Sequence, residues 1–136
     1  MAGCDDMPTP GLAPAFTLEA PLGEPIEVGR LATGGRRRHV PLPRGAFRGE
    51  GIEAALVAGS ETWLERPDGV TVVEANLLVR TADGCTIRLI GTGYRTDVTR
   101  MTIVFEADED GPLGHLTTRA FLAERRGDVL AIERIV

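Results

Sequence analysis

The sequence predicts an all-β domain of about seven to nine antiparallel strands joined by hairpins, with little or no helix. Turn signals at 66–69 (Arg-Pro-Asp-Gly) and 82–84 (Ala-Asp-Gly) bracket an alternating strand at 70–80. Proline presets φ and glycine accepts positive φ, which is why such stretches mark hairpins. Short apolar segments separated by turn residues recur along most of the chain, a spacing typical of a sandwich or a barrel.

The bulk composition indicates one soluble globular domain. A length of 136 residues fits a single core, which we place at residues 15–136. Residues 1–14 are rich in proline and acid, which predicts a disordered leader and no signal peptide. The net charge of −5 argues against a nucleic-acid partner, and the basic run at 36–38 is interpreted as a solvated strand edge or loop. No apolar run approaches the ~18 residues that span a bilayer, so we expect a cytoplasmic protein with no membrane partner.

Local alternation and turn residues place the individual strands. The predicted strands are 15–20, 36–42, 52–57, 62–66, 70–80, 85–91, 101–106, 116–124 and 129–136. The segment 52–57 is predicted as a strand because Gly51 and Gly59 leave too few residues for a stable helix. The Gly- and Pro-rich segment 21–35 is predicted to loop across the domain, and residues 45–49 to form a turn or bulge.

Glycines and acidic residues punctuate the C-terminal half. Gly91 and Gly93 predict a bend or bulge of the kind that curls a sheet. Residues 108–114 form an acidic loop rich in Gly and Pro, and a turn at 126–128 joins the last hairpin.

Six short stretches of the chain follow one another in a characteristic order. They are Gly35-Arg36-Arg37 with Val40-Pro41-Leu42, Gly45-Ala46-Phe47-Arg48-Gly49, Ala58-Gly59-Ser60-Glu61-Thr62-Trp63, Arg66-Pro67-Asp68-Gly69, Glu74-Ala75-Asn76 and Thr81-Ala82-Asp83-Gly84. In order and spacing they resemble a family of small bacterial and fungal barrels, the domain of unknown function 3237. The resemblance covers about residues 16–136. It implies a single antiparallel β-barrel that is often oligomeric, so we expect a homo-oligomer, a dimer.

Three positions depart from the pattern of that family. Thr62 stands where the family usually has an Asp before the tryptophan, and Asn76 stands where it has an Arg. A Trp-Leu-Asn stretch of the family reads His-Leu-Thr at 115–117. We expect such positions to line a ligand-facing lumen, which is either tuned here to a different ligand or has lost an ancestral activity.

Glu74 is the first candidate for catalysis. It lies on the strand 70–80, on the face that also carries Val70, Val72, Asn76 and Leu78. If that face is inward, desolvation would make Glu74 a general acid or base near neutral pH. The period of two does not say which face is inward, so a solvent-exposed Glu74 stays open.

Other polar and aromatic residues are candidates for the same lumen. Trp63, the only tryptophan, is either a flat pocket wall or a large core residue. Tyr94 is a candidate catalytic hydrogen-bond donor, with a satisfied rim position as the alternative. His115 is a candidate catalytic proton carrier. The predicted substrate-binding residues are Trp63, Asn76, Arg66 and Arg88, although Arg66 could instead brace the turn at Asp68.

The sequence predicts no cofactor and no metal site. His39 and His115 are far apart in the chain, and the cysteines Cys4 and Cys85 lack metal-ligand spacing. No Gly-rich phosphate loop leads into a helix. Ser60 lacks the second glycine of a nucleophile elbow, which argues against a serine hydrolase.

These features favour a cofactor-independent isomerase or cyclase that acts on a small organic intermediate bound inside the barrel. Holding a flexible substrate in a reactive shape can contribute ~7–11 kcal/mol to such a reaction. One alternative is a non-catalytic barrel that binds a small molecule. Another is a lyase or hydrolase in which an acid activates water, and a third is an oligomeric structural protein with a filled barrel.

Overall fold

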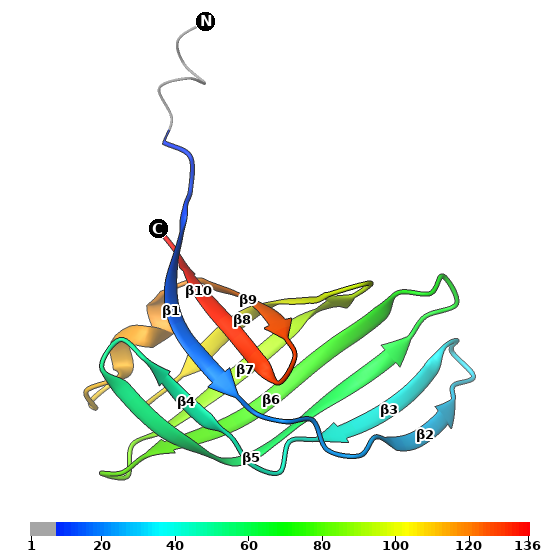
Figure 1. The fold of residues 1–136 in the computed structure, drawn as a ribbon, viewed down its shortest axis with the longest axis horizontal. Helices are drawn as coiled ribbons and strands as arrows, with labels where there is room; N and C mark the ends of the chain where they lie inside the picture. Colours follow the sequence, from blue (N-terminus) through cyan, green and yellow to red (C-terminus); the bar gives the residue numbers. More distant parts are fainter. Residues whose placement is uncertain (1–7) are drawn as a thin grey trace, which may run out of the picture.

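The computed structural model describes residues 8–136, which form ten β-strands and one short 3-10 helix (Figure 1). The strands are β1 (Leu12–Glu19), β2 (Ile26–Arg30), β3 (Arg36–Pro41), β4 (Ala46–Gly49), β5 (Ile52–Glu65), β6 (Thr71–Thr81), β7 (Thr86–Arg95), β8 (Thr99–Glu106), β9 (Phe121–Arg126) and β10 (Val129–Ile135), and the helix is η1 (Gly114–Thr118). No helix within residues 8–136 is long and apolar enough to cross a lipid bilayer.

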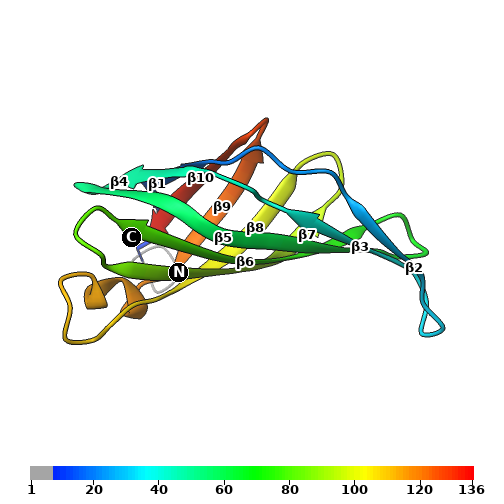
Figure 2. The same ribbon diagram turned by 90° about the horizontal axis from the view of Figure 1, so that it is seen from below.

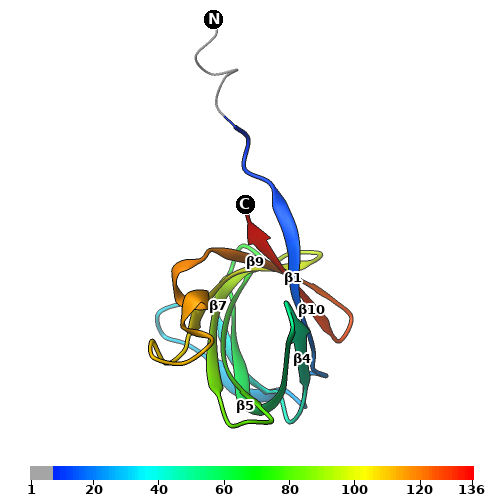
Figure 3. The ribbon, with the colours of Figure 1, turned by 90° about the vertical axis from the view of Figure 1, so that its left-hand side faces the viewer.

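The sheet closes on itself through β5 and β6. Its strand order is β2-β3-β5-β4-β1-β10-β9-β8-β7-β6, and β5 pairs with β6 as well. The eight strands β1 and β4–β10 therefore form a closed antiparallel barrel, which Figure 3 shows end-on. The predicted all-β barrel is confirmed.

β5 has two partners along one of its edges. Its first residues, Ile52–Ala55, pair with β4, and its last, Ser60–Glu65, pair with β3. β3 pairs in turn with β2, which ends the sheet. The β2–β3 hairpin lies at the opposite end of the molecule from η1 (Figures 1 and 2). Among the described strands, none of β8–β10 pairs with β2, so the sheet is not closed at this end.

Three predicted loops or breaks are strands in the structure. The expected loop at 21–35 contains β2, which two ion pairs of Glu27 with arginines of β3 hold in place. Residues 45–49 supply β4 and not a turn, and the strands expected at 52–57 and 62–66 are parts of β5. β5 continues past Gly59 because a bulge between Leu56 and Ala58 absorbs the irregularity.

Both ends of the barrel domain also differ from expectation. Residues 116–118 belong to η1, because Leu116 buries its side chain against the barrel, and β9 begins only at Phe121. β1 begins at Leu12, inside the expected leader, and Gly11 exchanges two backbone hydrogen bonds with Val136 at 3.1 and 3.0 Å. Residues 1–7 of that leader lie outside the described residues.

Alternating side chains fill the barrel nearest η1. Phe16, Phe47, Phe105 and Phe121 are each 3% exposed or less. Phe16 stacks on Phe47 with ring centroids 4.7 Å apart, and Phe105 meets Phe121 edge-on at 4.8 Å. Leu116 of η1 belongs to the same core. This end is therefore an aromatic core, while the polar inward residues lie toward the β2–β3 end.

Gly91 and Gly93 allow close strand approach and form no bulge. The register of β7 with β6 and with β8 is regular through both glycines. A Cβ on Gly93 would overlap the carbonyl oxygen of Arg100, and one on Gly91 would lie 3.0 Å from Cδ1 of Ile103. The bulge expected here as one possibility is absent; these positions need glycine because β8 lies too close for a side chain.

We predict that Gly93→Ala destabilises the fold by about 1–3 kcal/mol, because the new methyl group meets backbone and not a movable side chain. Urea denaturation of both proteins measures the difference. Gly111→Ala is the matched control, since a Cβ there lies 3.4 Å from the nearest atom, the carbonyl oxygen of Asp108. Equal stability of the two variants would contradict the close-approach explanation.

Candidate functional site

Glu74 faces away from the barrel interior. On β6 the residues Val73, Ala75, Leu77 and Val79 are 3% exposed or less, whereas Glu74 is exposed. Strand alternation fixes this, because Val73 and its partners face inward and its neighbours must face outward. The expectation of a desolvated carboxylate at Glu74 is therefore wrong, and the open alternative of a solvent-facing Glu74 holds.

Asn76 and Arg88 also lie on the outer face. Nε of Arg88 donates a hydrogen bond to Oδ1 of Asn76 at 3.0 Å, and Nη1 of Arg88 lies 2.8 Å from Glu106. The three side chains form a ladder across β6, β7 and β8. The structure thus brings two predicted substrate-binding residues together outside the barrel and not in a lumen.

Tyr94 belongs to an apolar groove on the outside of the barrel. Its side chain is 57% exposed, and the groove of about 370 Å³ runs over β7–β10. Leu12, Leu122 and Ala131 supply apolar lining, and Arg100, Glu124 and Glu133 supply charge. Tyr94 is therefore separated from the interior by the sheet itself.

His115 and Arg66 lie at opposite ends of the molecule. His115 is exposed on η1, beyond the aromatic core. Arg66 is exposed in the β5–β6 turn, where its Nε lies 3.2 Å from Oδ1 of Asp68 and its Nη2 bonds to Oδ2. The alternative that Arg66 braces this turn is the one observed.

A polar cluster does occupy the barrel interior, and it is built by three strands. β5 directs Glu61 and Trp63 inward, because each pairs with a buried residue of β6 (Ala75 and Val73). β7 contributes Arg95, and β9 contributes Arg125. Thr71 and Thr99, 6% and 7% exposed, lie opposite Arg95 on the neighbouring strands and mark the same inner face.

Glu61 is the centre of this cluster. It is 1% exposed, and Nε1 of Trp63 donates a hydrogen bond to its Oε1 at 3.0 Å. Arg125, whose side chain is 11% exposed, forms an ion pair with Oε2 of Glu61 across the barrel. Arg95 lies over the Trp63 ring at 4.1 Å from the centroid, a cation–π contact. A carboxylate, an indole and two guanidinium groups thus converge inside the barrel.

Small residues occupy the inward positions of β6 and β7 next to these long side chains. Ala75, Gly91 and Gly93 occupy inward positions on β6 and β7 beside the cluster. Trp63 and Arg95 are only half-buried, because the sheet is not closed on the side of β2 and β3. The cluster therefore lies at the open end of the barrel, buried at Glu61 and reachable at Trp63.

Sequence reasoning missed Glu61, Arg95 and Arg125. A signal for Glu61 was present, because it stands two residues before Trp63 and must share its face. Arg95 and Arg125 carry no comparable signal, since their roles depend on which strands meet across the barrel. No group of three or more His, Cys, Asp or Glu side chains within residues 8–136 is arranged to hold a metal ion.

The sequence matches the family described as protein of unknown function (DUF3237) over residues 10–133. The chain belongs to this family. Two Rhodopseudomonas palustris proteins described as UPF0311 proteins are each 31% identical to it over 81 residues, 59% of this chain. The chain spans about half of their length, 52%.

Solved structures share the DUF3237 fold at low sequence identity. A Clostridium acetobutylicum protein of unknown function matches with a TM-score of 0.83 and 23% identity, over 94% of this chain and all of its own. The R. palustris protein of unknown function matches with a TM-score of 0.82 and 22% identity, over 96% of this chain and 100% of its own. A protein from Penicillium herquei described as an enzyme matches with a TM-score of 0.78 and 17% identity, over 96% of this chain and 98% of its own.

The departures from the DUF3237 pattern lie outside the interior. Thr62 pairs with exposed Glu74 and lies between the inward residues Glu61 and Trp63, so it faces outward. Asn76 is in the outer ladder, and His115 and Thr117, which flank the buried Leu116, are exposed on η1. The expectation that these positions line a lumen is wrong.

We predict that Glu61→Ala costs about 3–5 kcal/mol of folding stability, because it leaves Arg125 charged, largely buried and unpaired. Urea denaturation gives the value. Glu74→Ala on the adjacent strand is the control and should change stability by less than about 0.5 kcal/mol, since Glu74 is exposed. Similar costs for both would contradict the buried position of Glu61.

We predict an acid-shifted titration for Asp68. Hydrogen bonds from Arg66 and from the backbone N–H of Val70 hold the pKa of Asp68 below its usual range. A lowered pKa in the folded state means that this carboxylate supports the turn at neutral pH, and the support is lost as pH falls through that pKa. An NMR titration should show the Asp68 midpoint rising in Arg66→Gln. An unchanged midpoint would contradict the bracing role.

Proposed function

We propose that this chain is a cofactor-independent isomerase or cyclase that acts on a small organic molecule at the open end of the barrel. In this proposal Glu61, and not Glu74, carries the proton. The observation that carries the proposal is a carboxylate buried inside the barrel, paired with Arg125 and bonded to the half-buried Trp63. A carboxylate shielded from bulk water can exchange protons with a bound substrate without competition from solvent.

The chemistry needs only proton transfer. The Glu61 carboxylate removes a proton from a carbon or hydroxyl of the substrate, and the electron pair moves onto a substrate carbonyl oxygen. The Arg95 guanidinium provides positive charge for that oxygen, because preorganised charge is most effective where charge develops. Glu61 then returns the proton at a different atom, so the product is an isomer and nothing is oxidised. Trp63 provides the wall on which a planar substrate lies.

A barrel that binds without reacting is the second candidate. Both oxygens of Glu61 already accept a hydrogen bond, one from Trp63 and one from Arg125, which favours a fixed structural carboxylate.

The lyase or hydrolase alternative needs a second acid or a histidine facing Glu61. His115 lies on η1, and His39 pairs with outward-facing Thr62, so neither histidine supports it.

We predict protein-dependent exchange of substrate C–H for deuterium in D2O, followed by proton NMR on a panel of small enolisable ketones. Glu61→Gln should slow exchange by about 10²–10⁴-fold, the typical contribution of a general base. Glu74→Gln should leave the rate within a few-fold. Exchange that persists in Glu61→Gln, or ketones that shift the Trp63 indole signal without exchanging, would overturn the catalytic proposal.

A further inference from the structure

We propose that the open end of the barrel takes a planar organic anion, an aromatic carboxylate or a phenolate. Its ring would lie against Trp63 and its charge would meet Arg95. This inference rests on the proposed function only for the location of the site, and it does not depend on the proposed reaction. It assigns the class of ligand that the site selects.

The Arg95 guanidinium has no acidic partner within the described chain. No carboxylate of residues 8–136 lies within 4.0 Å of it, although it is half-buried and directed to the inner face. Its observed neighbour is the Trp63 ring. A half-buried cation without a counter-charge is held at a cost, and an anionic ligand would supply the missing charge.

The other charges around Trp63 are already balanced. Arg125 is paired with Glu61 inside the barrel. Arg38, opposite Trp63 on β3, lies 3.0 Å from Glu27 and 3.9 Å from Glu65. The positive charge of Arg95 is therefore in excess at this end, which selects against a second cation and for an anion.

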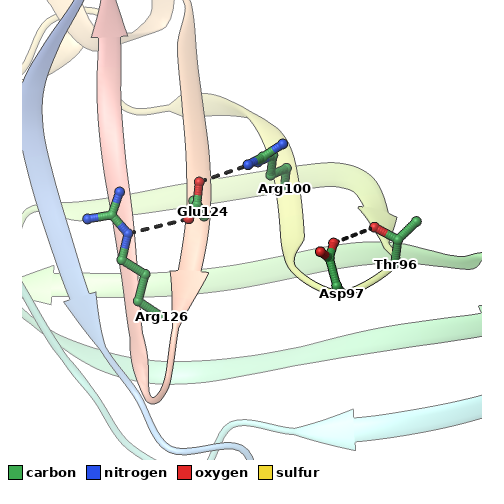
Figure 4. Close-up of polar contacts among 5 residues, drawn as sticks. All are labelled: Thr96, Asp97, Arg100, Glu124 and Arg126. Carbon is green, nitrogen blue, oxygen red and sulfur yellow. Dashed lines mark hydrogen bonds and ion pairs between the residues drawn. The ribbon is translucent and has the colours of Figure 1, made fainter.

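Asp97, two residues after Arg95, is engaged elsewhere. Figure 4 shows its carboxylate at Thr96, whose Oγ1 donates to Oδ1 at 3.0 Å. This hydrogen bond and those from the backbone N–H groups of Asp97 and Val98 lower the pKa of Asp97, with a smaller effect from the charge of Arg100. Asp97 thus has its own partners in the β7–β8 loop and leaves Arg95 free.

Shape supports the same class of ligand. A guanidinium is planar, and its paired N–H groups can meet both oxygens of a carboxylate. A planar anion can therefore lie along Trp63 while its charged end reaches Arg95.

The outer groove is a poor competitor for such an anion. Arg100 in that groove is paired with Glu124 at 3.3 Å, and Glu124 is also bonded to Arg126 (Figure 4). Glu133 adds a further negative charge to the lining. The groove therefore offers no free cation, and Tyr94 at its rim provides a separate signal for any binding there.

The test is an NMR titration with benzoate and benzamide, which share a shape and differ in charge. The chain has one tryptophan, so the Trp63 indole N–H gives a single assigned signal. Benzoate should shift this signal saturably. Benzamide should bind with an affinity at least about tenfold lower than that of benzoate. Arg95→Gln should weaken benzoate binding about tenfold or more, whereas Arg48→Gln, an exposed arginine on β4, should leave it unchanged.

Several outcomes would overturn the inference. These are equal binding of benzoate and benzamide, unchanged benzoate binding in Arg95→Gln, or benzoate shifts confined to Tyr94. The last would place the anion in the outer groove. Benzoate binding at Trp63 without any ketone exchange would refute the catalytic proposal and sustain this one. Ketone exchange that depends on Glu61, in a protein that does not bind benzoate, would sustain the catalytic proposal and refute this inference.

Discussion

The pairing of β5 with β6 is the constraint on which the rest of the molecule depends. It joins the last strand of the sheet back to an earlier one, so that every residue of eight strands points either into the barrel or out of it. A slip of one residue along β5 would turn Glu61 and Trp63 outward and bring Thr62 inward. The turn at 66–69 fixes this register, because Asp68 accepts hydrogen bonds from both Arg66 and the backbone of Val70.

The closed sheet separates its interior into two regions of different chemistry. Four phenylalanines and Leu116 fill the end nearest η1, where burial of apolar surface stabilises the fold. At the other end Glu61 and Arg125 are buried together, although apolar side chains of the same volume would stabilise a barrel at least as well. The two charges therefore depend on each other, because removal of either one would leave the other buried without a partner.

The sequence was sufficient for the fold and insufficient for the site. Turn residues and alternation predicted most strands, and the resemblance carried by the six short stretches predicted the barrel. Alternation also separates Glu74 from Val73, but only the closed sheet shows that Val73 is inward. Arg95 and Arg125 come from strands far from Glu61 in the chain, and only tertiary structure reveals that they meet. The short strand β2 could not be predicted from the sequence, because its residues are mostly exposed and do not alternate between buried and exposed positions.

β1 and β10 lie side by side, although almost the whole domain separates them in sequence. During translation, the first part of β1 stays unpaired until β10 has been synthesised, because its other partner, β4, pairs with only Thr17–Glu19. At typical elongation rates that delay is about 5–20 s, during which much of one strand edge is unprotected. The pairing of β1 with β10 is thus a late, non-local event, and a topology that depends on such pairings is expected to fold slowly.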